Sequence, residues 1–316
     1  TGNTGAAGAF LTLGVVYFIV MIIAAFQYRV PAKDWKPDGY TPPSKDESAT
    51  KMKTLNNVHI NQAIKTPQFY QLWIVLCFNV SAGIGVIGVA KTMMSEIFGS
   101  APAGSEMATM VTAGFAGSYV LMISVFNMCG RFIWASLSDY IGRKNTYHCF
   151  FVIGTLLYLS IPFAANAVSV DPKIMYLIMF YAATMIIFTM YGGGFATIPA
   201  YLADMFGTMH VGGIHGRLLT AWSAAGVIGP LAIAQLRQLS VNNALDALKA
   251  KIDPTVFLEK FGAPIEKIDE LVKAKTVTIS KLMEIAPVGT VDPTPSLYNT
   301  TMYAMAFLLV IAFFSN

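Results

Sequence analysis

The chain has 316 residues, of which 55% are hydrophobic and only 12% charged, and its formal net charge is +4. A soluble domain carries about 25% charged residues, so this composition excludes an ordinary soluble enzyme or binding domain. The small positive charge does not indicate nucleic-acid binding, because the basic residues flank apolar runs instead of lining one soluble face.

The apolar residues are gathered into runs of about 20, and a helix of about 20 residues crosses the roughly 30 Å of a bilayer's hydrocarbon core. We predict about seven spans, and therefore an all-α, polytopic membrane protein. The first run lacks a basic leader and a small-residue cleavage site, so we interpret it as a span and not as a signal peptide. The predicted spans are residues 5–26, 69–98, 110–137, 147–165, 174–199, 218–236 and 298 onward.

The charges between the spans predict their orientation. The segment between the first two spans carries seven Lys and Arg residues, whereas the loop 99–109 carries none. By the positive-inside rule the basic segment is cytoplasmic, and the basic loops 138–146 and 207–217 agree with this assignment. The long segment after the sixth span then lies outside. Its residues 264–272 predict short amphipathic helices that form a small cap, with a poorly ordered linker as the alternative.

These predictions divide the chain into five parts. They are a span (1–27), a proline-containing cytoplasmic linker (28–66), the first five spans of a six-span bundle (67–239), an extracytoplasmic loop (240–297) and a truncated last span (298–316). One span, a linker and six spans are what remains of a six-plus-six transporter cut within its first half, so we expect a fragment. A heptahelical receptor has the same number of spans and is the alternative from a different class.

Arg131 is the most informative residue, because it lies in the inner half of the third predicted span. An arginine at the centre of a span costs about 2.5 to 3.5 kcal/mol on insertion scales, so it normally faces water or a partner. Ser124, Asn127 and Ser138 recur with it at helical spacing and predict one polar stripe on a wet path. A guanidinium matches a carboxylate in shape and charge, so we predict capture of an anionic substrate. A structural ion pair with an acid of another span is the alternative.

Aromatic residues beside glycines mark the fifth and sixth predicted spans. Tyr191 and Phe195 lie four residues apart around three glycines, and Trp222 precedes Gly226 and Gly229. Aromatic side chains can wall a cavity, and neighbouring glycines let the helix backbone bend. Together they suit a small ligand in a cavity that opens alternately to each side. Ordinary packing between helices is the alternative.

Other patterns in the second span have structural explanations. Gly83, Gly85 and Gly88 match the dinucleotide fingerprint, but inside a span glycines permit close helix packing or local unwinding instead. Lys91 and Glu96 lie toward the outer end of this span, where we expect interface anchors, with a gate-forming ion pair as the alternative.

We predict no catalytic, metal or cofactor site. The three cysteines show no paired spacing, and His210 and His215, which we place on a cytoplasmic loop, have no carboxylate or cysteine at ligand spacing. The predicted spans hold no Ser/His/Asp set and no paired carboxylates, which argues against an enzyme.

The run DYIGRK that begins at Asp139 resembles the loop signature of the major facilitator superfamily. It stands at the cytoplasmic end of the third span, where that family repeats the motif in its second half, although Ala135 replaces the usual leading glycine. The resemblance implies that Asp139, Gly142 and Arg143 form a conformational latch at the ends of neighbouring helices. We expect Asp204, at the inner end of the fifth span, to be the partner of Arg143.

Three longer stretches, residues 127–139, 191–199 and 215–226, resemble the oxalate/formate antiporter family, a relative of the monocarboxylate transporters. The resemblance extends over essentially the whole chain and implies that it holds spans six to twelve of twelve. It also implies that Arg131 corresponds to the family's substrate-binding arginine. Tyr191 and Phe195 would correspond to the aromatic residues of the family's pocket.

One position departs from the family. Its oxalate exchangers carry a lysine in the span that corresponds to the sixth here, and the aligned residue is Trp222. A dianion would then meet one fixed positive charge instead of two and leave a net negative charge in a cavity of low dielectric. We therefore expect a monocarboxylate of the pyruvate, lactate or formate type, with oxalate/formate exchange as the alternative and an anion channel as a third possibility.

The resulting expectation is a secondary transporter of the cell membrane, the bacterial inner membrane, that works by alternating access. Arg131 would bind the carboxylate, Asn127 and Ser124 would orient it, and the three aromatic residues would wall the pocket. The expected partners are the small carboxylate, a coupled proton or counter-anion, the lipid bilayer and the missing N-terminal half of the same protein, with no nucleic acid. Exchange, proton symport and uniport would all use this arginine.

Overall fold

The computed structural model describes residues 5–29, 32, 35, 38–39, 57–99 and 106–316. Most of the predicted linker 28–66, with most of its lysines, lies outside the described residues. The chain divides into two compact units, Thr1–Glu47 and Ser48–Asn316.

The first unit contains the helix α1, Ala6–Gln27, at nearly the same bounds as the first predicted span. Its residues are apolar on all sides and none is buried within the chain. A helix of this length that is apolar all round has the composition of a membrane span.

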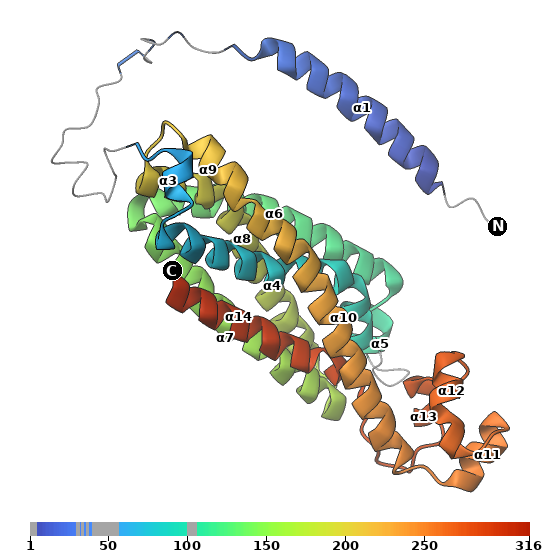
Figure 1. Ribbon diagram of the computed structural model, residues 1–316. Helices are drawn as coiled ribbons and strands as arrows, with labels where there is room; N and C mark the ends of the chain where they lie inside the picture. Colours follow the sequence, from blue (N-terminus) through green and yellow to red (C-terminus); the bar gives the residue numbers. More distant parts are fainter. Residues whose placement is uncertain (1–4, 30–31, 33–34, 36–37, 40–56, 100–105) are drawn as a thin grey trace. The chain divides into compact units, whose positions relative to one another are not determined.

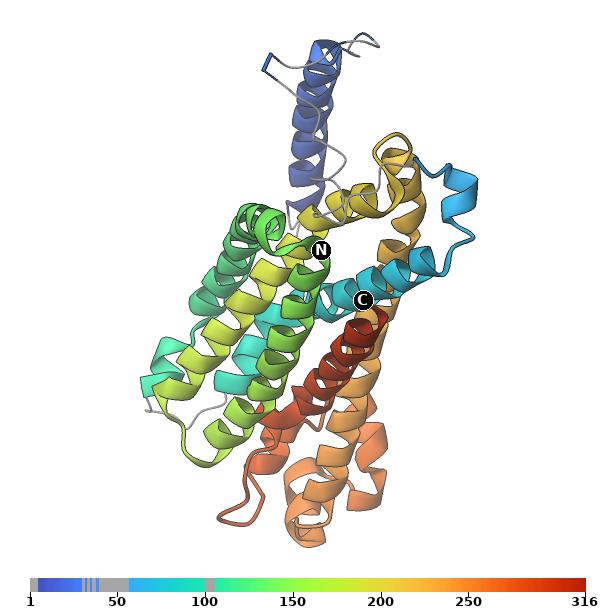
Figure 2. The ribbon, with the colours of Figure 1, turned by 90° about the vertical axis from the view of Figure 1, so that its left-hand side faces the viewer.

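The second unit is a bundle of six long helices (Figure 1). Together with α1 these helices account for the seven candidate membrane spans found in the described part of the chain, so the prediction of seven spans is confirmed. The described residues form helices and no strand, which confirms the all-α fold. The long helices are α4 (Pro67–Phe98), α6 (Ala113–Ile141), α7 (Arg143–Val170), α8 (Ile174–Phe206), α10 (Thr220–Lys249) and α14 (Asn299–Ser315). In Figure 2 the red helix α14 lies between α7 in green and α10 in orange.

Several helices extend beyond the predicted spans. Helix α7 begins at Arg143 instead of 147, and α8 continues through Pro199 to Phe206. Helix α7 begins with the polar residues 143–146, which hydropathy leaves out of a span, whereas Pro199, taken as the end of the fifth span, lies inside α8. The prediction of a loop at 207–217 was wrong, because most of it forms the helix α9, Val211–Leu218, which carries His215.

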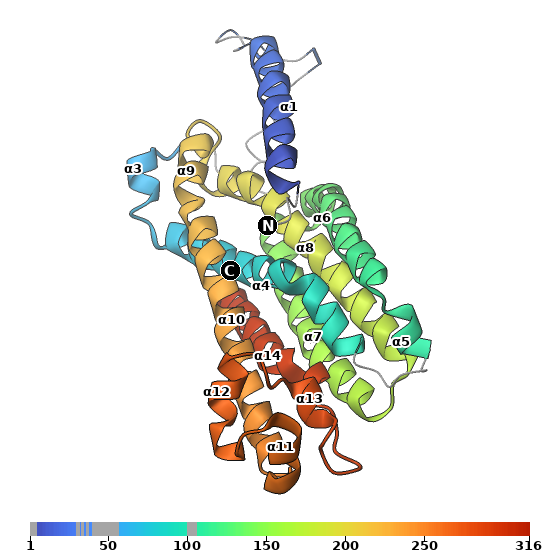
Figure 3. The same ribbon diagram turned by 90° about the vertical axis from the view of Figure 1, so that its right-hand side faces the viewer.

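The segment after the sixth span is folded. Helix α10 runs past the predicted boundary at residue 239, and short helices gather around its far end, away from α3 (Ile60–Ala63) and α9 (Figure 3). They share a core with Leu245 and Leu248 of α10, so the predicted short helices are confirmed. We call this part the cap; its helices are α11 (Pro254–Phe261), η1 (Ile265–Lys267), α12 (Ile268–Lys273) and α13 (Ile279–Met283).

The first cap helix begins with a capping residue. The backbone N–H of Thr255 donates to Oδ1 of Asp253 at 2.7 Å. The hydroxyl of Thr255 donates to the same oxygen. These two hydrogen bonds hold the pKa of the Asp253 carboxyl below its usual value. Pro254 at the first helical position adds a second start signal. The other short helices of the described part are α5 (Glu106–Met110) and η2 (Thr294–Tyr298).

Helices α6 and α8 pack backbone against backbone. A Cβ atom added at Gly130 would lie 2.0 Å from the carbonyl oxygen of Thr189, and one added at Gly192 would lie 2.0 Å from that of Asn127. Only glycine permits this approach, as in other packed membrane helices. The contact brings Arg131, one turn after Asn127, next to the aromatic residues of α8.

Candidate functional site

Side chains from three helices meet around Arg131. Its guanidinium carbon lies 5.3 Å from the centroid of the Phe195 ring, a cation–π contact between α6 and α8. The Phe195 ring lies 4.7 Å from that of Trp222 on α10, and the Trp222 ring lies 5.9 Å from that of Tyr191. We call Tyr191, Phe195 and Trp222 the aromatic cluster. Residues singled out in three separate spans are therefore neighbours in space.

Exposure rises across this group. Tyr191 is only 8% exposed, Phe195 and Trp222 are half-buried, and Arg131 is exposed. An apolar wall thus stands behind a cation that is accessible from one side. This arrangement can hold a small anion by its charged end and shield an apolar end from water.

The guanidinium of Arg131 takes part in none of the five ion pairs formed within the described part of the chain. The expected alternative, a structural pair with an acid of another span, therefore has no counterpart among these residues. A guanidinium that pairs with no carboxylate among the described residues keeps its planar set of donors for an external anion.

The polar stripe on α6 is shorter than predicted. Asn127 is half-buried one turn before Arg131, and Ser124 is exposed, with its hydroxyl donating to the carbonyl of Val120 at 3.4 Å. Ser138, in contrast, is 1% exposed and donates to the Ala135 carbonyl at 2.7 Å. The prediction that Ser138 lies on a wet path was wrong, because at this end of α6 the side chain of an arginine from α7 covers it.

That covering group is Arg143, the centre of a polar cluster at the end of the bundle where α6 meets α7. Its Nε lies 3.3 Å from Oδ2 of Asp204, and its other nitrogens hydrogen-bond to Asp139 and Ser138. We call these four residues the latch cluster. The arginine side chain is 14% exposed, that of Asp204 22% and that of Asp139 64%, so the pair with Asp204 is the more protected.

The turn that positions the latch cluster requires glycine. Gly142 joins α6 to α7 with φ +87° and ψ 150°, a conformation that residues with a side chain rarely adopt. The latch cluster thus joins the C-terminal ends of α6 and α8 to the N-terminal end of α7 around one fixed turn.

An ion pair that the sequence did not predict lies at the other end of the bundle. Glu96 of α4 pairs with Arg237 of α10, with Nε and Oε2 3.2 Å apart, and the same Nε donates to the hydroxyl of Tyr298 at 3.1 Å. Glu96 is therefore held in an ion pair, which was the alternative to an interface anchor, and its partner is Arg237. We call Glu96 and Arg237 the outer ion pair, after the side on which the charge pattern predicts this end of the bundle. Arg237 lies just past the predicted end of the sixth span, and its partner is 141 residues away.

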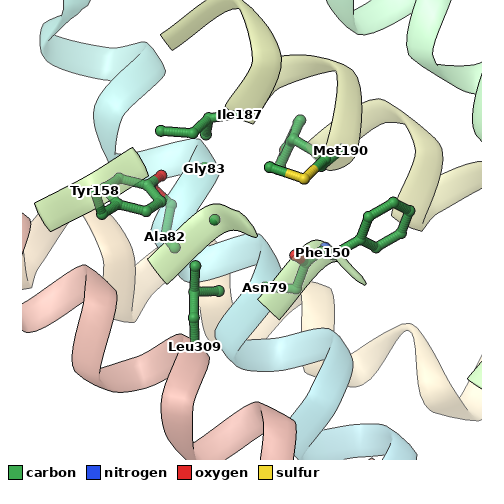
Figure 4. Close-up of a pocket in the computed structure, with 10 residues that line it drawn as sticks. Asn79, Ala82, Gly83, Phe150, Tyr158, Ile187, Met190 and Leu309 are labelled. Carbon is green, nitrogen blue, oxygen red and sulfur yellow. The ribbon is translucent and has the colours of Figure 1, made fainter. Parts of the chain in front are cut away.

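A small cavity lies behind the aromatic cluster, between α4, α7, α8 and α14 (Figure 4). The volume in which the centre of a water molecule can lie within this cavity is about 10 Å³. That volume holds about one water, far less than a ligand site of several hundred Å³ requires. The residues that line it include Asn79, Gly83, Tyr158, Met190, Tyr191 and Leu309.

The sequence matches the family model described as Major Facilitator Superfamily over residues 1–235. It is 27% identical over 277 residues to the oxalate:formate antiporter of Oxalobacter formigenes, a match that covers 84% of this chain and 58% of that protein. It is 25% identical over 169 residues to the uncharacterized MFS-type transporter YhjX of Escherichia coli (strain K12), covering 52% of this chain and 37% of that one. The chain thus spans less than two thirds of the length of the curated relatives it matches.

Proposed function

Because this chain belongs to the major facilitator superfamily and holds seven helices fit to cross a membrane, we propose that it is part of a secondary transporter of small organic anions. The substrates are monocarboxylates of the pyruvate, lactate or formate type. The similarity to an oxalate:formate antiporter supports a small carboxylate as cargo and a second anion as its counter-substrate. A proton is the other candidate for coupling.

The observation that carries the proposal is the position of Arg131. Its guanidinium is exposed, lies over the Phe195 ring at 5.3 Å and is absent from the ion pairs of the described residues. A carboxylate would accept two parallel hydrogen bonds from it, each of about 1.5 to 3 kcal/mol for a charged partner. Asn127 and Ser124 would orient the anion, and the aromatic cluster would wall its apolar end.

The charge of the cargo follows from the wall opposite Arg131. From Thr220 to the residue before Arg237, α10 contains no Lys or Arg. Arg237 lies about 22 Å from Trp222 along the helix axis at 1.5 Å per residue, and it is paired with Glu96. One fixed positive charge at the site favours an anion with one negative charge, because the second charge of a dianion would stay uncompensated.

Uptake by the complete protein in proteoliposomes tests this function. We expect saturable, counterflow-competent uptake of labelled formate, lactate or pyruvate, which a channel or a receptor would not produce. Arg131→Gln should weaken apparent affinity by about 100-fold or more, the equivalent of two charged hydrogen bonds. Arg217→Gln is the matched control, because this arginine hydrogen-bonds Asn61 on α3, outside the candidate site. Normal uptake by the Arg131 variant would refute the site.

A further inference from the structure

The ring of Tyr191 occupies the space that a side chain at Gly83 would need. A Cβ atom added at Gly83 would lie 2.2 Å from Cδ2 of Tyr191, 2.7 Å from Cε2 and 2.9 Å from Cγ. All three distances are far inside van der Waals contact, so the ring and any larger residue at position 83 exclude each other. The tyrosine of the aromatic cluster therefore lies directly on the backbone of α4.

The three glycines of this α4 motif have different surroundings. At Gly85 an added Cβ would meet the Ile233 side chain at 2.6 Å and the Gly229 carbonyl at 3.1 Å, so this glycine serves the crossing with α10. At Gly88 an added Cβ would meet nothing within 4 Å. Gly83 is thus the one of the three that faces the aromatic cluster.

The Tyr191 ring has little room to retreat from a side chain at position 83. Its neighbours include the rings of Trp222 at 5.9 Å and Phe188 at 6.3 Å. The cavity behind Gly83, seen in Figure 4, has room for about one water, much less than a phenol ring needs. On this side the Tyr158 hydroxyl also holds the α4 backbone by donating to the Ala82 carbonyl at 2.8 Å. A displaced ring would move toward Trp222 and the open face that carries the guanidinium.

We infer that Gly83 is a positioning residue of the anion site: its missing side chain sets the depth of the Tyr191 ring and hence the room left for the apolar end of a carboxylate bound at Arg131. This inference rests on the proposed function. It makes position 83 a determinant of cargo size, although Gly83 itself does not touch the cargo.

The consequence is a loss of affinity that grows with the size of the substrate. Gly83→Ala should raise the half-saturation concentration for pyruvate or lactate on the order of tenfold, the usual scale of overpacking by one methyl group. Formate has no apolar end, so its half-saturation concentration should change by less than about twofold. A general loss of folded protein would lower the maximal rate for all three substrates alike.

Uptake by the complete protein tests this, with Gly88→Ala as the matched control on the same helix. Gly83→Ala is also measured in a Tyr191→Ala background, where the ring that it would displace is absent. In the Tyr191→Ala background, we expect Gly83→Ala to cause no further loss of affinity for pyruvate or lactate relative to formate, because the two changes act through one contact. Equal behaviour of the two alanine variants, or an undiminished effect without the ring, would overturn it. If Gly83→Ala alone fails to fold, the double variant must recover folding, and its failure to do so would also count against the inference.

A readout without substrate separates this inference from the proposed function. Acrylamide quenching of tryptophan fluorescence should differ between Gly83→Ala and Gly88→Ala, and the difference should vanish in a Trp222→Phe background. If that pattern appears while Arg131→Gln transports normally, the proposed anion site is wrong and the steric role of Gly83 stands. If Arg131→Gln abolishes uptake while the quenching of the two glycine variants is the same, the proposed anion site stands and the steric role of Gly83 is wrong.

Discussion

Replacing Trp222 by lysine should convert the site from one that accepts single carboxylates to one that accepts dicarboxylates. Trp222 is half-buried on α10, and its ring contacts that of Phe195, which in turn lies under the guanidinium of Arg131. A lysine side chain is long enough to place its ammonium beside the same phenylalanine. The two cations would then flank the space that the proposed substrate occupies.

The size of the effect can be estimated from Coulomb's law. A carboxylate about 4 Å from the new ammonium gains about 4 kcal/mol at an effective dielectric constant of about 20. In the empty site, two cations roughly 10 Å apart repel each other by about 2 kcal/mol at the same dielectric constant, and a dianion relieves this repulsion. Desolvation of the lysine and of the second carboxylate removes several kcal/mol of this gain. A net preference of about 1 to 3 kcal/mol remains, which shifts the ratio of oxalate to formate affinity by about 5- to 150-fold.

Competition by unlabelled oxalate against labelled formate uptake measures this ratio. Trp222→Gln is the matched control, because it removes the indole ring without adding a charge. The lysine variant should be inhibited by oxalate at much lower concentrations than either the control or the wild type. The charge argument is refuted if wild-type protein already prefers oxalate, or if the lysine and glutamine variants respond alike.

Three further predictions concern the contacts that hold the bundle, each measured by thermal unfolding in detergent. Asp204→Asn should destabilise by about 1 to 3 kcal/mol, because it removes the more protected partner of the latch arginine, whereas Asp139→Asn at a 64% exposed carboxylate should cost under about 1 kcal/mol. Equal losses would contradict the burial argument. Glu96→Gln should also cost about 1 to 3 kcal/mol by leaving a partly buried guanidinium without its carboxylate, and replacing the outer arginine by glutamine as well should recover part of it. Gly192→Ala should cost about 3 kcal/mol or more, since its Cβ would meet a backbone carbonyl of α6 at 2.0 Å, whereas Gly212→Ala with nothing within 4 Å should be neutral or slightly stabilising.

The number and order of spans were predictable because each apolar run is long enough to cross a membrane by itself. Their ends were not, since α8 continues past Pro199 to Phe206 and α10 continues into the cap. Pro199 lies inside α8, and α10 stays helical in the polar residues after Leu236, so neither the proline nor the fall in hydropathy marks the end of its helix. The short helices of the cap were predictable from local amphipathic spacing, whereas their shared core with Leu245 and Leu248 of α10 depends on tertiary packing.

The residues of the candidate site differ in how well they could be predicted from the sequence alone. Arg131 stands out because a charge inside a span carries a known cost, and its neighbours on α6 follow from helical spacing. The convergence of Tyr191, Phe195 and Trp222 on this arginine joins helices α6, α8 and α10, and no local pattern encodes it. The packing of the Tyr191 ring against Gly83 and the outer ion pair are also contacts between residues far apart in the chain, which no local pattern encodes.

Helix α10 connects the candidate site to both the bundle and the cap. It carries Trp222 in the aromatic cluster, crosses α4 where a Cβ at Gly229 would meet the Ser81 carbonyl at 2.7 Å, and enters the outer ion pair through Arg237. Sliding α10 along α4 would have to break a backbone contact and an ion pair together, and the cap would move with it. We therefore expect the bundle of α4 to α14 to move as one body. If the proposed function holds, access to Arg131 would change by motion of this bundle as a whole, as in carriers whose halves rock about a central site.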